Sequence, residues 1–167
     1  RAYLGQIGED RKRWDEALAW YSAVTPGNQY LPARMRAAHV LARQGKLAEA
    51  RRWLQQTSIG NPAEQSQLLI AEAQLLREAN RGEEAYAVVA EGLAAHPDQA
   101  DLLYESAMLA ERIDKLEVME RNLRRLIEIK PDHAHAYNAL GFSLADRNLR
   151  LDEALELIDK ALQLAPD

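Results

Sequence analysis

The chain has 167 residues, of which 47% are hydrophobic and 28% are charged, a composition typical of a folded protein. It contains no cysteine, which excludes a disulfide framework, a thiol nucleophile and a zinc-thiolate site. The net charge of −5 argues against binding nucleic acid by neutralising phosphates, and no apolar run approaches the length of a membrane-spanning helix.

A pattern with a period near 34 residues runs through the chain. A small residue, replaced once by methionine, recurs at spacings of 33, 35, 34 and 35, and a bulky residue follows four positions later. The pairs are Ala17 and Tyr21, Ala50 and Leu54, Ala85 and Val89, Met119 and Leu123, and Ala154 and Ile158. A period of this length predicts stacked helical hairpins.

The period divides the chain into hairpins, which we interpret as a single array over 1–167, cut from a longer array. The predicted repeats are 1–30 (partial), 31–65, 66–99, 100–133 and 134–167. In the fourth repeat, apolar residues spaced three and four apart predict helices over 102–112 and 116–129.

Two kinds of residue mark the helix ends. Gly45, Asn80 and Asp114 stand five residues before the small position, and Asn148 stands six before it. These residue types tolerate the left-handed conformation, so each is predicted to end the first helix of its hairpin. Pro62, Pro97, Pro131 and Pro166 are predicted to close repeats, and Asp98 and Asp132 to cap the helices that follow.

These features together resemble the tetratricopeptide repeat (TPR). The matching residues in the last repeat are Tyr137, Leu140, Gly141, Ala154, Ile158, Ala161 and Pro166. The resemblance implies an all-α, right-handed superhelical solenoid of antiparallel hairpins that binds proteins. In that family the first helix of each hairpin lines the concave side. Thr57 and Met119 replace the family's alanines, from which we expect slightly looser packing.

The resemblance also indicates which side chains face the concave groove, where we expect a protein or peptide to bind. Apolar anchors flanked by charges of both signs suit such a partner. The candidate residues are Met35, His39, Arg43, Ile70, Gln74, Arg77, Tyr104, Met108, Glu111, Asn138, Phe142 and Asp146. Ala2 and Gln6 hold the equivalent positions in the first repeat.

No catalytic, cofactor or metal site is predicted, and we expect no enzyme activity. His133 and His135 point to different sides of a helix and lack a third ligand. Paired acids such as Asp152 and Glu153 begin second helices, where the helix dipole favours them. The basic run of Arg121, Arg124 and Arg125 is predicted to lie on a solvated convex face.

A narrower resemblance concerns three segments, Leu4–Ile7, Trp14–Tyr21 and Asn138–Arg147. They resemble TPR outer-membrane lipoproteins of Gram-negative bacteria, including the adaptor for a carboxyl-terminal processing protease. The resemblance implies a periplasmic scaffold that brings a protease and its clients together, and a cytoplasmic location is the alternative.

Two other functions stay open. Leu155, Ile158 and Leu162 are expected to face a further hairpin or another molecule, so the chain could be a homo-oligomerisation module. It could equally be the TPR region of a larger enzyme.

Overall fold

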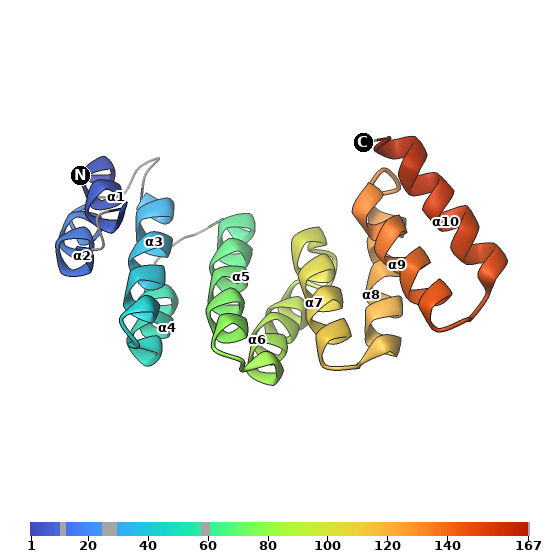
Figure 1. Cartoon of the computed structure of the whole chain (residues 1–167), viewed down its shortest axis with the longest axis horizontal. Helices are drawn as coiled ribbons and strands as arrows, with labels where there is room; N and C mark the ends of the chain where they lie inside the picture. The colour runs from blue at the N-terminus through green and yellow to red at the C-terminus, as the bar shows by residue number, and fades with distance from the viewer. Residues whose placement is uncertain (11–12, 25–29, 58–60, 167) are drawn as a thin grey trace. The chain divides into compact units, whose positions relative to one another are not determined.

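The computed structural model describes residues 1–10, 13–24, 30–57 and 61–166, with the side chains of 8–10 excepted. The described residues form ten helices and no strand, which confirms the all-α prediction (Figure 1). The helices are α1 (Ala2–Asp10), α2 (Trp14–Ser22), α3 (Tyr30–Arg43), α4 (Leu47–Gln55), α5 (Pro62–Glu78), α6 (Gly82–Ala95), α7 (Ala100–Arg112), α8 (Leu116–Ile129), α9 (Ala134–Asp146) and α10 (Leu151–Leu164).

The chain divides into two compact units, an N-terminal unit, Arg1–Arg81, and a C-terminal unit, Gly82–Asp167. The N-terminal unit holds α1 to α5 and the C-terminal unit holds α6 to α10. Within each unit, every helix packs against the next helix along the chain. Sequential packing of this kind is what a hairpin repeat requires, because each helix buries its apolar face against its neighbours.

Four hairpin turns have the predicted left-handed residue. The φ angles are 81° at Gly45, 60° at Asn80, 62° at Asp114 and 55° at Asn148. In each turn the amide of the following residue donates to a carbonyl five residues earlier, as Lys115 does to Ala110 at 2.8 Å. This is the hydrogen bond of the Schellman motif, so the predicted turns are confirmed.

The recurring small positions are buried in the core. Ala17, Ala50 and Ala85 are fully buried, and Met119 is 2% exposed. In the last hairpin a Cβ atom on Gly141 would lie 2.8 Å from Cγ1 of Ile158. Ile158 therefore packs inward against α9, and the prediction that it faces outward with Leu155 and Leu162 is wrong.

The predicted helix caps need correction. The N-caps of α7 and α9 are Gln99 and His133, one residue after the predicted aspartates. The Asp98 carboxylate instead accepts from Arg125 of α8 at 2.8 Å. That distant arginine offers the carboxylate a charged partner, which competes with the backbone amides that a cap would use.

Pro62 begins a helix instead of closing a repeat, because it occupies the first turn of α5, where a missing backbone N–H costs nothing. The Asn61 side chain caps this helix by accepting from the Ala63 amide at 2.8 Å. As a result α5 begins four residues before the predicted boundary at 66.

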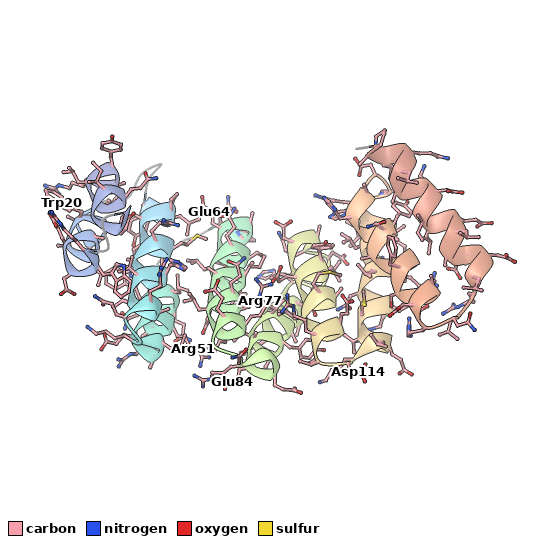
Figure 2. The ribbon with its side chains drawn as sticks, in the orientation of Figure 1. Trp20, Arg51, Glu64, Arg77, Glu84 and Asp114 are labelled. Atoms are coloured by element: carbon pink, nitrogen blue, oxygen red, sulfur yellow. The ribbon has the colours of Figure 1, made fainter. Side chains whose placement is uncertain are left out.

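Buried polar groups join helices in both units. In the N-terminal unit, the Glu72 carboxylate of α5 accepts from Nε of Arg51 at 3.0 Å and Nε2 of Gln55 at 2.8 Å, both on α4 (Arg51 is marked in Figure 2). In the C-terminal unit, the Asn122 amide of α8 donates to the Ser106 hydroxyl of α7 at 3.1 Å. Buried polar groups need such partners, since an unpaired one costs free energy.

Arg34 of α3 contacts the C-terminal end of α4 and the residues that follow it. Its guanidinium lies 3.7 Å from the centroid of the Trp53 ring and donates to the Trp53 carbonyl at 3.1 Å and to Thr57 Oγ1 at 3.0 Å. Thr57 is buried and also donates to the Trp53 carbonyl. The expectation of looser packing at Thr57 stays a prediction, because the hydroxyl is hydrogen-bonded but Thr57 also lines a pocket of about 370 Å³ between α4 and α5.

Candidate protein-binding surface

The predicted groove residues of the N-terminal unit lie on two first helices. Met35, His39 and Arg43 lie on α3, and Ile70, Gln74 and Arg77 lie on α5, where Figure 2 marks Arg77. Their spacing places each trio on one side of its helix. Arg43 and Gln74 are exposed and the other four are partly buried.

The remaining candidates lie on α7 and α9 of the C-terminal unit. The first trio is Tyr104, Met108 and Glu111, and the second is Asn138, Phe142 and Asp146. Tyr104 and Met108 rest partly on the core, whereas the Phe142 side chain is 56% exposed. Phe142 is therefore a large apolar group that the core of its own unit does not use.

Tyr104 belongs to a cluster of three rings. Its centroid lies 5.3 Å from that of His133 and 6.4 Å from that of His135, and the two histidine rings are 6.2 Å apart. His135 precedes Asn138 and Phe142 by three and seven residues, so the three share a face of α9. The sequence patterns do not predict this contact of the two histidines with Tyr104, although the helical spacing already places His135 and Phe142 on one face.

His133 has a second role, as the N-cap of α9. Its Nδ1 atom accepts from the Ala136 amide at 3.1 Å, which requires that nitrogen to be unprotonated. Partial burial lowers the pKa of His133 below its ordinary value of 6.5, and the positive charge of Lys130 acts in the same direction. The neutral form of the cap is thus favoured.

Acidic groups surround the Tyr104 phenol. Partial burial raises the pKa of Tyr104, and the negative charges of Glu105 and Glu111 raise it further. Asp101 acts on His133 from the first turn of the same helix α7. The Tyr104 phenol therefore lies in a negative local field, whereas at His133 the charge of Lys130 has a larger effect than that of Asp101.

The two units carry opposite net charges. The N-terminal unit has twelve basic and eight acidic residues, hence +4, whereas the C-terminal unit has nine basic and eighteen acidic residues, hence −9. The difference extends to the candidate residues, which include Arg43 and Arg77 in the first unit but Glu111 and Asp146 in the second. The predicted groove residues therefore form a basic set in the N-terminal unit and an acidic set in the C-terminal unit.

The arginine run on α8 is more than a solvated face. Arg124 pairs with Glu120 of its own helix at 3.0 Å and with Glu153 of α10 at 2.7 Å. Arg150, just before α10, also pairs with Glu120. The prediction of a merely solvated face is wrong for Arg124, because these ion pairs connect α8 to α10.

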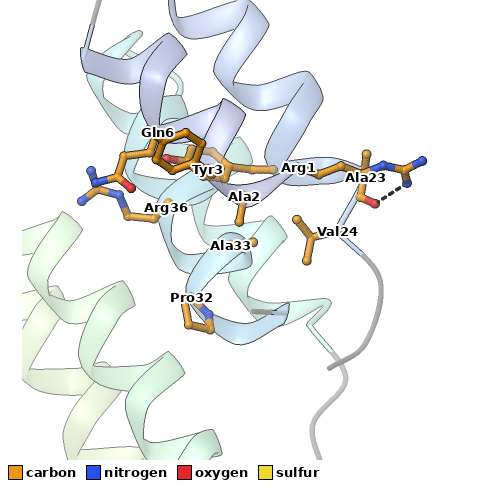
Figure 3. Close-up of a pocket in the computed structure, with 10 residues that line it drawn as sticks. Arg1, Ala2, Tyr3, Gln6, Ala23, Val24, Pro32, Ala33 and Arg36 are labelled. Atoms are coloured by element: carbon orange, nitrogen blue, oxygen red, sulfur yellow. Dashed lines mark hydrogen bonds between the residues drawn. The ribbon is translucent and has the colours of Figure 1, made fainter. Parts of the chain in front are cut away.

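A pocket of about 810 Å³ lies in the N-terminal unit between the first hairpin and α3 (Figure 3). It is lined by Arg1, Ala2, Tyr3, Gln6, Tyr21, Ala23, Val24, Pro32, Ala33 and Arg36. Ala2 and Gln6 are the groove positions predicted for the first repeat, so the pocket adjoins the predicted surface. The Arg1 guanidinium donates to the Ala23 carbonyl at 3.0 Å at its edge.

No group of three metal-ligating side chains is found within the ranges that the structure describes. None of the helices described there combines the length and apolar character needed to cross a lipid bilayer.

The hairpin pairs, the buried small positions and the left-handed turns define a tetratricopeptide-repeat fold. No family model matches the chain. Over 164 residues it is 42% identical to the TPR repeat-containing protein PA4667 of Pseudomonas aeruginosa, covering 98% of this chain and 28% of that protein. The chain thus spans less than a third of the length of this relative.

Solved structures share the fold at low sequence identity. MamA matches with a TM-score of 0.68 at 18% identity, over 98% of this chain and 95% of that one. YrrB, described as a TPR protein with an unusual peptide-binding site, matches with a TM-score of 0.64 at 19% identity, over 99% and 85%. MamA of Desulfovibrio magneticus RS-1 matches with a TM-score of 0.64 at 17% identity, over 98% and 92%.

Proposed function

We propose that the chain is a non-catalytic scaffold that binds a protein or peptide on the exposed faces of its first helices. The observation that carries the proposal is Phe142, a ring 56% exposed on the face of α9 that also carries His135 of the Tyr104 cluster. Large exposed apolar groups cost free energy in water unless a partner covers them. Aromatic residues are also the usual anchors of protein interfaces.

The neighbours of Phe142 support this function. Tyr104 and Met108 give a partly buried apolar floor, while Asn138 and Asp146 supply exposed polar groups on the same helix as Phe142. An apolar centre with a polar rim is the usual anatomy of a protein interface. Helix faces positioned by packed hairpins also hold their side chains in place before a partner binds.

We extend the proposal to a periplasmic adaptor for a carboxyl-terminal processing protease. The support is the resemblance of Leu4–Ile7, Trp14–Tyr21 and Asn138–Arg147 to TPR outer-membrane lipoproteins of that kind. In this role the scaffold binds the protease and its clients at once, and the parent protein sits in the outer membrane through a lipid anchor.

The test is affinity capture from the source cell with the full-length protein. The Tyr104→Ala/Phe142→Ala variant is compared with the unsubstituted protein. Loss of specific partners by the double variant is the expected result. The matched control is Glu117→Ala/Arg121→Ala, two exposed positions on α8. If the aromatic double variant captures the same proteins in the same amounts, binding by this surface is ruled out. Recovery of a processing protease would separate the adaptor role from general scaffolding.

Self-association is the second candidate, favoured by one observation. Leu151, Leu155 and Leu162 of α10 are 49%, 62% and 55% exposed and lie along one side of the helix. Multi-angle light scattering over a hundredfold concentration range tests this candidate. A mass that does not change with concentration, and that Leu155→Lys leaves unaltered, argues against it.

A further inference from the structure

We infer that the surface formed by Tyr104, Met108, His135 and Phe142, here called the Tyr104 surface, binds a linear segment of a partner protein in which an apolar side chain is flanked by lysine or arginine. This inference rests on the proposed function and specifies the partner's chemistry.

The apolar part of the segment follows from the rings. Tyr104 is held against His133 and His135, with ring centroids 5.3 Å and 6.4 Å away, so its position is set before binding. Phe142 projects from α9 with more than half of its surface in solvent. An aliphatic or aromatic side chain that covers Phe142 and Met108 removes this apolar surface from water.

The basic part follows from the charges at the two ends of the Tyr104 surface. Glu105 and Glu111 act on the Tyr104 phenol, and Asp146 lies one helical turn beyond Phe142. A cation beside Tyr104 gains from both carboxylates and from the electron-rich face of the ring. Basic groups are also close, because Lys130 acts on His133, and Arg112 and Arg147 directly follow Glu111 and Asp146 in the sequence.

The charges of the Tyr104 surface exclude an acidic partner, and they differ from the charges on the N-terminal unit. An acidic segment would be repelled by Glu105, Glu111 and Asp146. On α3 of the N-terminal unit, the corresponding face carries Arg36 and Arg43, which would repel a basic segment. Charge therefore assigns the basic segment to the C-terminal unit.

The test uses the whole 167-residue chain to select binders from a displayed library of random 12-residue peptides at low salt. We expect enriched peptides to carry lysine or arginine on both sides of a leucine, isoleucine, methionine or phenylalanine. Affinity of one enriched peptide, measured by fluorescence anisotropy, should fall about tenfold for Glu111→Lys/Asp146→Lys, because two exposed attractions become repulsions.

A matched variant separates local contact from overall charge. Glu117→Lys/Glu156→Lys changes the net charge by the same amount at exposed positions on α8 and α10 and should leave affinity within twofold. Circular dichroism melting of both variants shows whether they remain folded.

Four outcomes overturn the inference: acidic or neutral peptides are enriched, both charge variants lose affinity equally, Glu111→Lys/Asp146→Lys loses none, or no peptide is recovered. The proposed function then still stands or falls on the capture experiment. A fifth outcome also overturns the inference: peptides that bind Tyr104→Ala/Phe142→Ala as tightly as the unsubstituted chain, because they bind elsewhere.

Discussion

The N-terminal and C-terminal units build the same kind of hairpin but differ in how they use charge. The N-terminal unit buries the Glu72 carboxylate, 4% exposed, between two helices and stacks Arg34 on Trp53. The C-terminal unit joins its helices with a neutral pair, Ser106 and Asn122, and keeps its ion pairs near the surface. The repeat spacing determines the fold in both units, whereas residues between the recurring positions are free to set polarity and surface charge.

The largest expected effect breaks the buried ion pair of the N-terminal unit. Arg51→Ala leaves the Glu72 carboxylate buried beside the neutral Gln55 amide and without the positive charge of Arg51, so we expect a loss of about 3 kcal/mol in unfolding free energy. Hydrogen exchange should show faster opening of α5, with α8 unaffected. Arg52→Ala, an exposed neighbour on α4, is the control. Unchanged exchange in α5 would show that the pair contributes nothing.

The next effect concerns the close contact between α9 and α10 at Gly141. Gly141→Ala puts a Cβ atom 2.8 Å from Ile158 Cγ1 and 3.0 Å from the Ala154 carbonyl oxygen. We expect a loss of about 2 kcal/mol from overpacking, measured by urea denaturation. Ile158→Ala should cost less stability in the Gly141→Ala background than in the parent, because it removes the Cγ1 atom that the new Cβ meets. A Gly141→Ala variant as stable as the parent would mean that α9 and α10 shift apart freely.

A third prediction uses the pH dependence of the His133 cap. Its pKa is lower in the folded state than the ordinary 6.5, so the folded protein disfavours the proton. The stabilisation is therefore complete above pH 6.5 and is lost as pH falls through the lowered native pKa.

Loss of this cap should cost the C-terminal unit about 1 kcal/mol. Thermal melts of the parent between pH 7.5 and 5 should show the decline, and melts of His133→Asn should show less of it, because asparagine caps without titrating in this range. Parallel declines in the two proteins would assign the pH effect to other groups.

The smallest expected effects come from the left-handed turns. Gly45→Ala should destabilise the N-terminal unit by about 1 kcal/mol, because alanine at a φ of 81° is strained. Asp114→Gly should stabilise the C-terminal unit by about 0.5 kcal/mol, because glycine adopts a φ of 62° without strain. A lower melting temperature for Gly45→Ala and a higher one for Asp114→Gly would support the difference between the two turns. Shifts of both variants in the same direction would oppose it.

The sequence predicts those parts of the structure that depend on local spacing. The hairpins and the residues at positive φ follow from spacing alone, since Gly45, Asn80, Asp114 and Asn148 act within their own turns. Arg150, with a φ of 44°, was missed because arginine has no preference for that conformation.

The failures involve partners far apart in the chain. Asp98 pairs with Arg125, 27 residues away, and Glu72 pairs with Arg51, 21 residues away, so neither side chain could be placed from its neighbours. For the candidate surface, the resemblance to the TPR predicts that Tyr104 and Phe142 face the concave side, but the contact between the His133 and Tyr104 rings depends on how α7 and α9 meet. The binding function of those residues stays a prediction.

The Ser106–Asn122 pair has a consequence for folding fidelity. In a chain of similar hairpins, a helix can dock on the wrong neighbour with little loss of apolar burial, because the small and bulky positions recur. A misdocked α8 would bury the Asn122 amide without the Ser106 hydroxyl, and a buried amide without a partner costs about 1–3 kcal/mol. The Ser106–Asn122 hydrogen bond thus contributes to the specificity of docking. It adds little to the stability of the correct α7–α8 pair, but its loss destabilises incorrect helix pairs.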